Sequence, residues 1–209
     1  MNDISVILQA DGLSFAYPLQ PASPLFAGLA VALPPGVTLV CGDESSGKTT
    51  LLKLLAGQLP TTGTLRIRGT SLAENRTSYL SQLAWLDPRD AALDQQTARQ
   101  IFAALPQKHP GFESAALQDH IEGLSLTPHL DKALYRLSTG SRRKVLLAAV
   151  LASGCAVTLL DQPFMALDRP SIDYLLGLLA EAARHPGRAW LVADYEAPMG
   201  VTLAGVIRL

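Results

Sequence analysis

The chain has 209 residues, of which 48% are hydrophobic and 17% charged, with a formal net charge of −1 at pH 7. This composition argues against a disordered chain or a coiled coil, and the length suffices for one compact domain with a buried core. Binding to a polyanion needs clustered Lys and Arg, so the near-neutral balance predicts no nucleic-acid partner.

The first third of the sequence carries short strand-like runs that turn residues separate. Four of these runs predict strands at residues 4–8, 13–17, 29–33 and 64–68. A fifth run, residues 37–41, is apolar and β-branched and leads into a glycine. A helix pattern follows at residues 48–56, with four leucines on its buried side and Gly57 as its stop.

The middle of the sequence, residues 87–136, has a helical pattern that four prolines interrupt. The last third alternates between helix and strand. Helices are predicted at residues 141–153 and 171–184, and strands at residues 157–160, 189–193 and 206–209. Such alternation indicates a parallel α/β sheet.

One apolar stretch, residues 145–160, raises the question of a membrane span. Its 16 residues carry no charge, but a helix needs ~20 to cross a bilayer, and Ser153, Gly154 and Cys155 interrupt it. A core helix followed by a buried strand is therefore predicted, with no direct membrane span. The first residues show no secretory signal pattern, so Cys41 and Cys155 are expected to be reduced and buried.

One segment carries a chemical motif. Gly42-Asp43-Glu44-Ser45-Ser46-Gly47-Lys48-Thr49 fits G-x-x-x-x-G-K-[ST] without a gap, between a buried strand and an apolar-faced helix. The backbone N–H groups of such a loop form a cradle for the β-phosphate. Lys48 would reach the β- and γ-oxygens, and the Thr49 hydroxyl would ligate Mg²⁺. This loop, together with Thr50, is the predicted binding site for ATP and Mg²⁺.

Two features of this phosphate loop are unusual. Asp43 and Glu44 add negative charge beside a polyphosphate, and Ser45 stands where many such loops have glycine. The charge costs little if both carboxylates point to solvent, because water screens them.

Five further segments extend the pattern. They are Leu13-Ser14-Phe15-Ala16-Tyr17-Pro18, Tyr79-Leu80-Ser81-Gln82, Leu137-Ser138-Thr139-Gly140-Ser141, Val157-Thr158-Leu159-Leu160-Asp161 and Ala166-Leu167-Asp168. With them the chain resembles the ATPases of the ATP-binding cassette (ABC) transporter family over essentially its whole length. Residues 137–141 are the most discriminating segment, because they resemble the family signature Leu-Ser-Gly-Gly-Gln, which other P-loop classes lack.

The resemblance implies a role for each segment. Tyr17 would stack on adenine, with Phe15 as the alternative stacking residue. Gln82 would be the Q-loop glutamine that touches Mg²⁺ or the attacking water. Asp161 would hold Mg²⁺ through water, and Asp168 would belong to the D-loop.

The signature segment would act on a partner subunit. In the family's dimers, each ATP lies between the phosphate loop of one subunit and the signature of the other. A hydroxyl and a close backbone N–H at a helix start suit a γ-phosphate. An N-capped surface helix is the alternative interpretation. The residues assigned to this role are Ser138, Thr139, Gly140 and Ser141.

Two positions depart from the family, although the catalytic set is still predicted as Lys48, Gln82, Asp161 and Gln162. Gln162 stands where the family has glutamate, and losing a general base typically removes ~10²- to 10⁴-fold in rate. After residues 189–193, where the switch histidine should follow, the sequence reads Asp194-Tyr195-Glu196, which leaves open whether Asp194 or Tyr195 takes that position. Asp194 or Glu196 is an alternative source of the missing charge. The four histidines lie elsewhere, at His109, His120, His129 and His185.

The resemblance implies a single α/β domain with a P-loop NTPase core of mainly parallel sheet, formed by residues 37–62 and 137–209. An antiparallel β part is expected at residues 1–36 and 63–70, and a helical subdomain at residues 83–136.

The implied function is an ATP-binding and slowly hydrolysing subunit that couples dimer closure to a separate membrane permease at the cytoplasmic face. Its partners would be that permease and a second cassette, in a homodimer or a heterodimer. The alternative is a hydrolysis-deficient regulatory or assembly subunit paired with an intact cassette. ABC proteins of DNA repair or translation are a weaker third class, because the chain has no coiled-coil insertion, second cassette or basic face.

Overall fold

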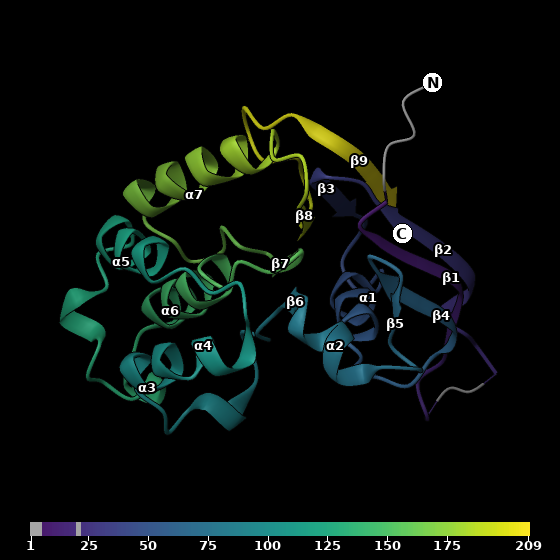
Figure 1. The fold of residues 1–209 in the computed structure, drawn as a ribbon, viewed down its shortest axis with the longest axis horizontal. Coiled ribbons are helices and arrows are strands. Elements are labelled where there is room, and N and C mark those ends of the chain that lie inside the picture. Colours follow the sequence, from purple (N-terminus) through teal and green to yellow (C-terminus); the bar gives the residue numbers. More distant parts are fainter. Residues whose placement is uncertain (1–5, 20–21) are drawn as a thin grey trace.

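The structure is a computed structural model, and it describes residues 6–19 and 22–209. Two sheets form its framework. An antiparallel sheet has the order β2-β1-β4-β5, and a parallel sheet has the order β6-β7-β8-β3-β9. Figure 1 shows the antiparallel sheet at one end of the molecule and helices α3 to α6 at the other.

The strands of the antiparallel sheet are β1 (Leu8–Phe15), β2 (Phe26–Leu33), β4 (Thr62–Ile67) and β5 (Thr70–Ser71). Those of the parallel sheet are β3 (Gly36–Cys41), β6 (Leu83–Ala84), β7 (Val157–Asp161), β8 (Ala189–Ala193) and β9 (Leu203–Arg208). The α-helices are α1 (Lys48–Leu55), α2 (Arg76–Ser81), α3 (Ala98–Ala103), α4 (Leu105–Lys108), α5 (Ser114–Gly123), α6 (Thr139–Leu151) and α7 (Arg169–Ala182). Three 3-10 turns add η1 (Ala91–Leu93), η2 (Thr127–His129) and η3 (Leu134–Arg136).

This architecture confirms the predicted α/β class, but the first strands differ from the prediction. The runs predicted at residues 4–8 and 13–17 do not form two strands, because a single strand, β1, runs from Leu8 to Phe15; residues 4–5 lie outside the described part. Asp11-Gly12 resembles a turn in the sequence. In the structure Gly12 has φ +66°, and the pairing register shifts there, so β1 absorbs the pair as a bulge and continues.

The region predicted as helical, residues 87–136, is less regular than expected. It contains α3, α4 and α5, each of ten residues or fewer, and the three 3-10 turns. Thr97 caps α3 in a capping box with Gln100, and the Asp90 side chain accepts from Ala92 N at the start of η1. Side-chain caps thus begin two of the six short elements of residues 87–136, whereas α4, α5, η2 and η3 begin without one.

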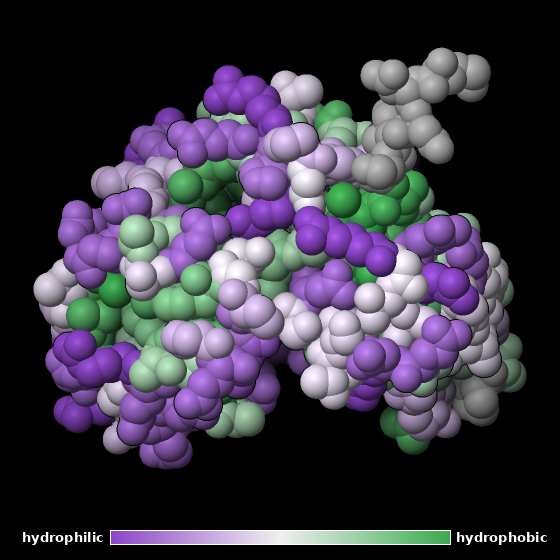
Figure 2. All heavy atoms as spheres, in the orientation of Figure 1, coloured by the Kyte–Doolittle hydropathy of each residue, from purple (hydrophilic) through white to green (hydrophobic). Residues whose placement is uncertain are grey.

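The core has two parts, one on each side of the parallel sheet. The first joins α1 to the antiparallel sheet, and the four leucines predicted for the buried side of α1 are all fully buried there. The second lies among α5, α6, α7 and the strands β7 and β8. Figure 2 shows a mostly hydrophilic surface on the viewed face, with apolar residues in smaller groups.

Both cysteines are free thiols, and Cys155 is buried while Cys41 is half-buried. None of the helices in the described part of the chain has the length and apolar character needed to cross a bilayer. The uncharged stretch at residues 145–160 forms the second half of α6, a turn and most of β7.

The turn between α6 and β7 gives a stability prediction. Gly154 has φ +63°, and a Cβ added there would lie 1.6 Å from the carbonyl oxygen of Gly111. We expect Gly154→Ala to lower the free energy of unfolding, measured in urea, by more than about 2 kcal/mol, because left-handed strain alone costs about 1–2 kcal/mol. Gly69→Ala is the control, since Gly69 has φ +81° and open space around its Cβ. Equal losses in the two variants would contradict the steric part of this account.

Candidate nucleotide-binding site

The phosphate loop connects the carboxyl end of β3 to the first residue of α1, Lys48. Two glycines let it turn tightly. Gly47 has φ +104°, and a Cβ there would lie 2.9 Å from the Phe26 ring. At Gly42 a Cβ would lie 2.6 Å from Ser46 Oγ and 2.7 Å from the backbone oxygen of Leu209. The glycine spacing that defines the motif is therefore a steric requirement of this turn.

Lys48 is a buried cation without a carboxylate partner. Its side chain is 6% exposed, and Nζ donates to the backbone oxygens of Gly42 (2.6 Å) and Asp43 (2.8 Å). Nζ also lies 4.3 Å from the centroid of the Tyr195 ring. Among the described residues, no ion pair involves Lys48. A buried ammonium that is held by dipoles and a π face, with the Asp194 carboxyl near it but not paired with it, fits a polyanion such as a triphosphate.

The acidic side chains of the loop leave this place open. Asp43 and Glu44 are both exposed, so their carboxylates face solvent and are screened. Ser45 adopts φ +63°, the left-handed conformation for which many such loops use glycine. Ser46 Oγ is buried and has no hydrogen-bond partner in the part of the chain that the structure describes.

Two side-chain oxygens that can ligate a metal ion meet beside the loop. The Thr49 hydroxyl of α1 donates to Asp161 Oδ2 at the end of β7, over 2.7 Å. Burial raises the pKa of the Asp161 carboxyl, and the hydrogen bond from Thr49 opposes that shift. A hydroxyl and a carboxylate are ligands that Mg²⁺ takes in proteins, and a cation here would relieve the cost of burying the Asp161 charge.

Tyr17 lies against the same helix. Its hydroxyl oxygen is 2.5 Å from Thr50 Oγ1, and its ring packs edge-on against Phe15 at 5.1 Å between centroids. Tyr17 is 46% exposed whereas Phe15 is 8% exposed, so the geometry favours Tyr17 as the stacking residue. Beside it lies an open hollow of about 390 Å³, lined by Phe15, Tyr17, Leu59, Pro60 and Thr61 among others.

Gln82 is not part of this site. It ends α2 and directly precedes β6, where its Nε2 donates to the Ser78 oxygen of its own helix. Since β6 pairs in parallel with β7, with Leu83 opposite Val157, Gln82 lies at the amino-terminal edge of the sheet. Asp161 is at the other edge, about 16 Å away along the strand at ~3.3 Å per residue. The Q-loop role predicted for Gln82 is therefore wrong.

Asp87 takes the place at the carboxyl edge that Gln82 does not reach. It is 8% exposed, pairs with Lys53 of α1 over 2.9 Å, and lies close enough to Asp161 to help raise its pKa. The sequence contains a signal for it, because an apolar run ends at Asp87-Pro88. The sequence favours Gln82 instead, because Gln82 matches the family motif and Asp87 does not.

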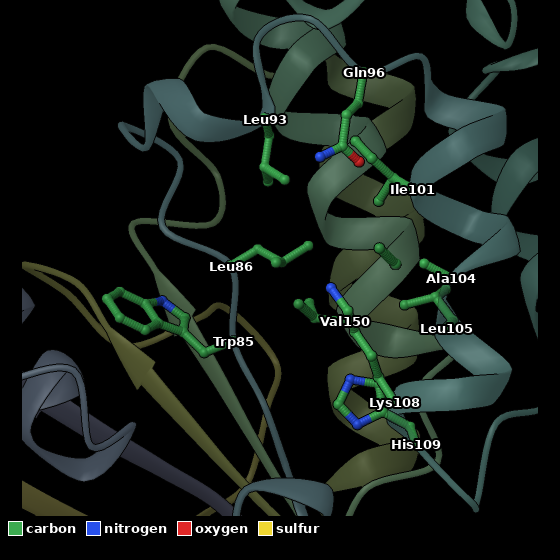
Figure 3. A pocket seen from close by; sticks show the side chains of 11 residues that line it. Trp85, Leu86, Leu93, Gln96, Ile101, Ala104, Leu105, Lys108, His109 and Val150 are labelled. Atoms are coloured by element: carbon green, nitrogen blue, oxygen red, sulfur yellow. The ribbon is translucent and has the colours of Figure 1, made fainter.

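The segment between β6 and Asp87 lines a groove against the helical part of the molecule. Figure 3 shows Trp85 and Leu86 on one side and Ile101, Leu105 and Val150 on the other. The free space is about 40 Å³, far below the roughly 300–1,000 Å³ of typical ligand pockets. A nucleotide therefore does not fit in this groove.

Gln162 follows Asp161 in a left-handed backbone conformation, with φ +45°. Its N–H donates to the Ala193 oxygen at the end of β8, and its own carbonyl accepts from Arg143 over 2.6 Å. Arg143 is 5% exposed and also donates to the Asp161 oxygen. Two neighbouring elements thus hold the backbone at Gln162. The sequence alone does not identify Arg143, because it stands in the basic run Arg142-Arg143-Lys144 and nothing in the sequence distinguishes it from its neighbours.

Asp194 and Tyr195 occupy different places after β8. The Asp194 N–H donates to the Val40 oxygen of β3, and burial is the main cause that raises the pKa of its carboxyl, with a smaller contribution from Asp161. Tyr195 is half-exposed, and its ring faces the Lys48 ammonium. Asp194 directly continues the strand, and Tyr195 covers the phosphate-loop lysine.

The signature segment begins α6 on the far side of the Asp161–Asp168 loop. Ser138 is the N-cap residue, exposed, and its Oγ accepts from Ser141 N over 3.1 Å. A Cβ at Gly140 would lie 2.3 Å from the Ala166 oxygen, so only glycine permits this approach. In the described residues no hydrogen bond joins the segment to the phosphate loop of the same chain.

The D-loop residue Asp168 is fixed by the signature helix. Lys144 of α6 lies 2.8 Å from its carboxylate, and that carboxylate also caps α7 by accepting from Ser171 N. The hydrogen bond from Lys144 is the main reason that the pKa of Asp168 falls to about 2. The candidate site therefore combines the phosphate loop, the Thr49–Asp161 pair and a separate exposed segment at the start of α6.

Known proteins match this chain over most of its length. The family model described as "ABC transporter" matches residues 27–165. The "Cytochrome c biogenesis ATP-binding export protein CcmA" of Pseudomonas putida is 32% identical over 75% of each chain. Its namesake from Alkalilimnicola ehrlichii is 35% identical over 86% of this chain and 77% of its own.

Solved structures show the same fold. The "ATP binding subunit of ABC transporter" superposes with a TM-score of 0.79 at 20% identity, covering 90% of this chain and 79% of that one. A putative ABC transporter ATP-binding protein from Pyrococcus furiosus gives a TM-score of 0.73 at 21% identity, covering 97% and 96%. By its family match and its relatives, the chain is an ATP-binding subunit of the ABC transporter family.

Proposed function

We propose that this subunit binds Mg-ATP at the phosphate loop and that ATP then closes a dimer that drives a separate membrane permease. The observation that carries the proposal is the buried Lys48 ammonium with no carboxylate partner among the described residues. Its two backbone acceptors are the loop's own carbonyls, so arriving phosphate oxygens gain a cation already in place. Tyr17 would stack on the adenine in the hollow beside it.

Thr49 and Asp161 would hold the Mg²⁺ that accompanies the nucleotide. When bound, that cation neutralises charge on the β- and γ-phosphate oxygens. The Thr49 hydroxyl, which now donates to Asp161, would turn its lone pairs to the metal. Asp87 would orient α1 through its ion pair with Lys53, and its negative charge would help to raise the pKa of Asp161.

The second half of each ATP site would come from a partner cassette. Ser138 and Thr139 are exposed at the start of α6, with the backbone N–H groups of that helix behind them. They would hold the γ-phosphate of an ATP bound to the other subunit, together with Gly140 and Ser141. The partner is a second copy of this chain or a different cassette.

Hydrolysis would be slow, because Gln162 lacks the charge of a general base. A second candidate function follows from the same residue: a nucleotide-gated regulatory subunit that clamps ATP beside an intact cassette. Steady-state turnover of the purified dimer separates the two. Asp194 has a raised pKa and lies near Lys48, which makes it a candidate substitute for the missing base.

The relatives bear on location and cargo. Their printed names describe ATP-binding export proteins of cytochrome c biogenesis. We infer that this chain serves an export system of that kind from the cytoplasmic face of the membrane. The permease would be the component that crosses the bilayer.

Replacing Lys48 tests nucleotide binding directly. We expect Lys48→Ala to weaken Mg-ATP binding by about 10- to 100-fold in calorimetry, because a hydrogen bond to a charged group contributes about 1.5–3 kcal/mol. Lys108→Ala is the control, since Lys108 is exposed on α4, away from the loop. Undiminished binding by Lys48→Ala would remove the loop from the proposal.

Restoring the glutamate tests the hydrolysis account. We expect Gln162→Glu to raise single-turnover ATP hydrolysis by about 10²-fold or more if the missing base limits the rate. Affinity for Mg-ATP should change little, since Gln162 is not placed on the phosphates. A rate equal to the unmodified chain would mean that another group, such as Asp194, already supplies the base.

Asp194 gives a pH-dependent stability prediction. Burial raises the pKa of its carboxyl, so the folded state favours the neutral acid and its ionised form costs stability at pH 7. We expect Asp194→Asn to raise the melting temperature at pH 7, and the gain to shrink as the pH falls below the raised pKa. Glu196→Gln is the control, because Glu196 is exposed and should show little effect at either pH. A gain that grows toward acid pH would have the wrong sign.

A further inference from the structure

A histidine stands behind the signature loop, in a place that the proposed function does not use. His129, in η2, has its Nε2 3.4 Å from Ser141 Oγ. Ser141 Oγ in turn lies 3.1 Å from Ser138 Oγ, which donates to it. Ser141 occupies the signature position where the family usually has glutamine. The three side chains therefore form a connected polar row that ends at the exposed N-cap hydroxyl of α6.

The surroundings of His129 determine which nitrogen carries the proton. Its Nδ1 is buried and has no hydrogen-bond partner within residues 6–19 and 22–209. A buried N–H without an acceptor is rarer and more costly than an unpaired lone pair, so the proton belongs on Nε2, where Ser141 Oγ accepts it. Burial, with Lys132 and Lys144 nearby, lowers the pKa of the imidazole and keeps it neutral near pH 7.

We propose that His129 is a positioning residue of the signature loop, which lets the Ser138 hydroxyl turn its proton from Ser141 to a phosphate of the partner's ATP. This inference rests on the proposed function. When Ser138 turns away, Ser141 Oγ loses a donor, but the His129 Nε2–H still satisfies it. Ser141 is then free to donate its own proton to Ser138 Oγ, which also accepts from Ser141 N.

Without His129, rotation of the Ser138 hydroxyl from Ser141 toward the phosphate would cost more free energy. The Ser138 hydroxyl would keep donating its hydrogen bond to Ser141 Oγ. Ser138 would then present a lone pair to the phosphate, and the negative charge of the phosphate repels that lone pair. The effect belongs to the in-trans half of the site. Binding of ATP by a single subunit should therefore be unaffected, and closure of the dimer around ATP should be weakened.

The test compares two substitutions of the same residue. His129→Leu removes the donor while keeping an apolar side chain of similar bulk, and His129→Gln keeps an N–H donor at similar reach. We expect His129→Leu to weaken ATP-driven dimerisation about three- to tenfold, the size of one neutral hydrogen bond. We expect His129→Gln to stay within about twofold of the unmodified chain. Sedimentation velocity measures dimerisation of the full chain, alone or with a cassette that copurifies with it.

Three controls separate the outcomes. Mg-ATP affinity of each single subunit, by calorimetry, should be unchanged, and His185→Leu, which lies away from the signature loop, should dimerise normally. In a Ser141→Ala background, His129→Leu should have no further effect, because the row is already interrupted. Normal dimerisation of His129→Leu, or equal weakening by His129→Gln, overturns the inference while leaving the proposed function intact. Failure of the unmodified chain to bind ATP or to dimerise overturns both.

Discussion

The site depends on one buried charge, the ammonium of Lys48, which has no ion-pair partner among the described residues. Burying a cation is costly unless dipoles or opposite charges surround it, and here two loop carbonyls and the Tyr195 ring supply only partial compensation. Gly42 and Gly47 are needed because a side chain at Gly42 would clash with Ser46 and Leu209, and one at Gly47 with Phe26. The tight turn, the helix start and the exposed acidic side chains of the loop all follow from keeping that charge available.

The parallel sheet brings the other groups to the same edge. Strands β3, β7 and β8 run side by side, with Val40 opposite Ala193 and Asp161 opposite Ala193 on the other side. The phosphate loop, Asp161 and Asp194 all leave from the carboxyl ends of these strands. Convergence of polar groups at this edge is a general property of open α/β sheets. It also concentrates negative charge, since Asp87 helps to raise the pKa of Asp161, and Asp161 helps to raise the pKa of Asp194.

How far the sequence predicts the site depends on how local each feature is. The phosphate loop and the starts of α6 and α7 are determined by consecutive residues. The predicted helix starts, at residues 141 and 171, therefore lie within two residues of the observed ones. The prediction for Gln82 is wrong because the role requires a residue after β6, whereas Gln82 precedes it. With a strand of only two residues, the sequence does not show where β6 begins and ends. The contacts of Arg143 and Tyr195 cross the fold, where no spacing rule reaches.

The same long-range contacts explain how the two halves of the site are connected. The signature helix α6 holds the Asp161–Asp168 loop at three points: Arg143 on the backbone of Asp161 and Gln162, Gly140 against Ala166, and Lys144 on Asp168. A movement of α6 would therefore shift the backbone of Asp161, the proposed Mg²⁺ ligand, in the same subunit. Because α6 would contact the partner's nucleotide and Asp161 its own, a shift caused by one ATP would reach the other through these short contacts, of which the one between Arg143 and the Asp161 oxygen is buried. Tight packing along this path favours two discrete arrangements over gradual bending.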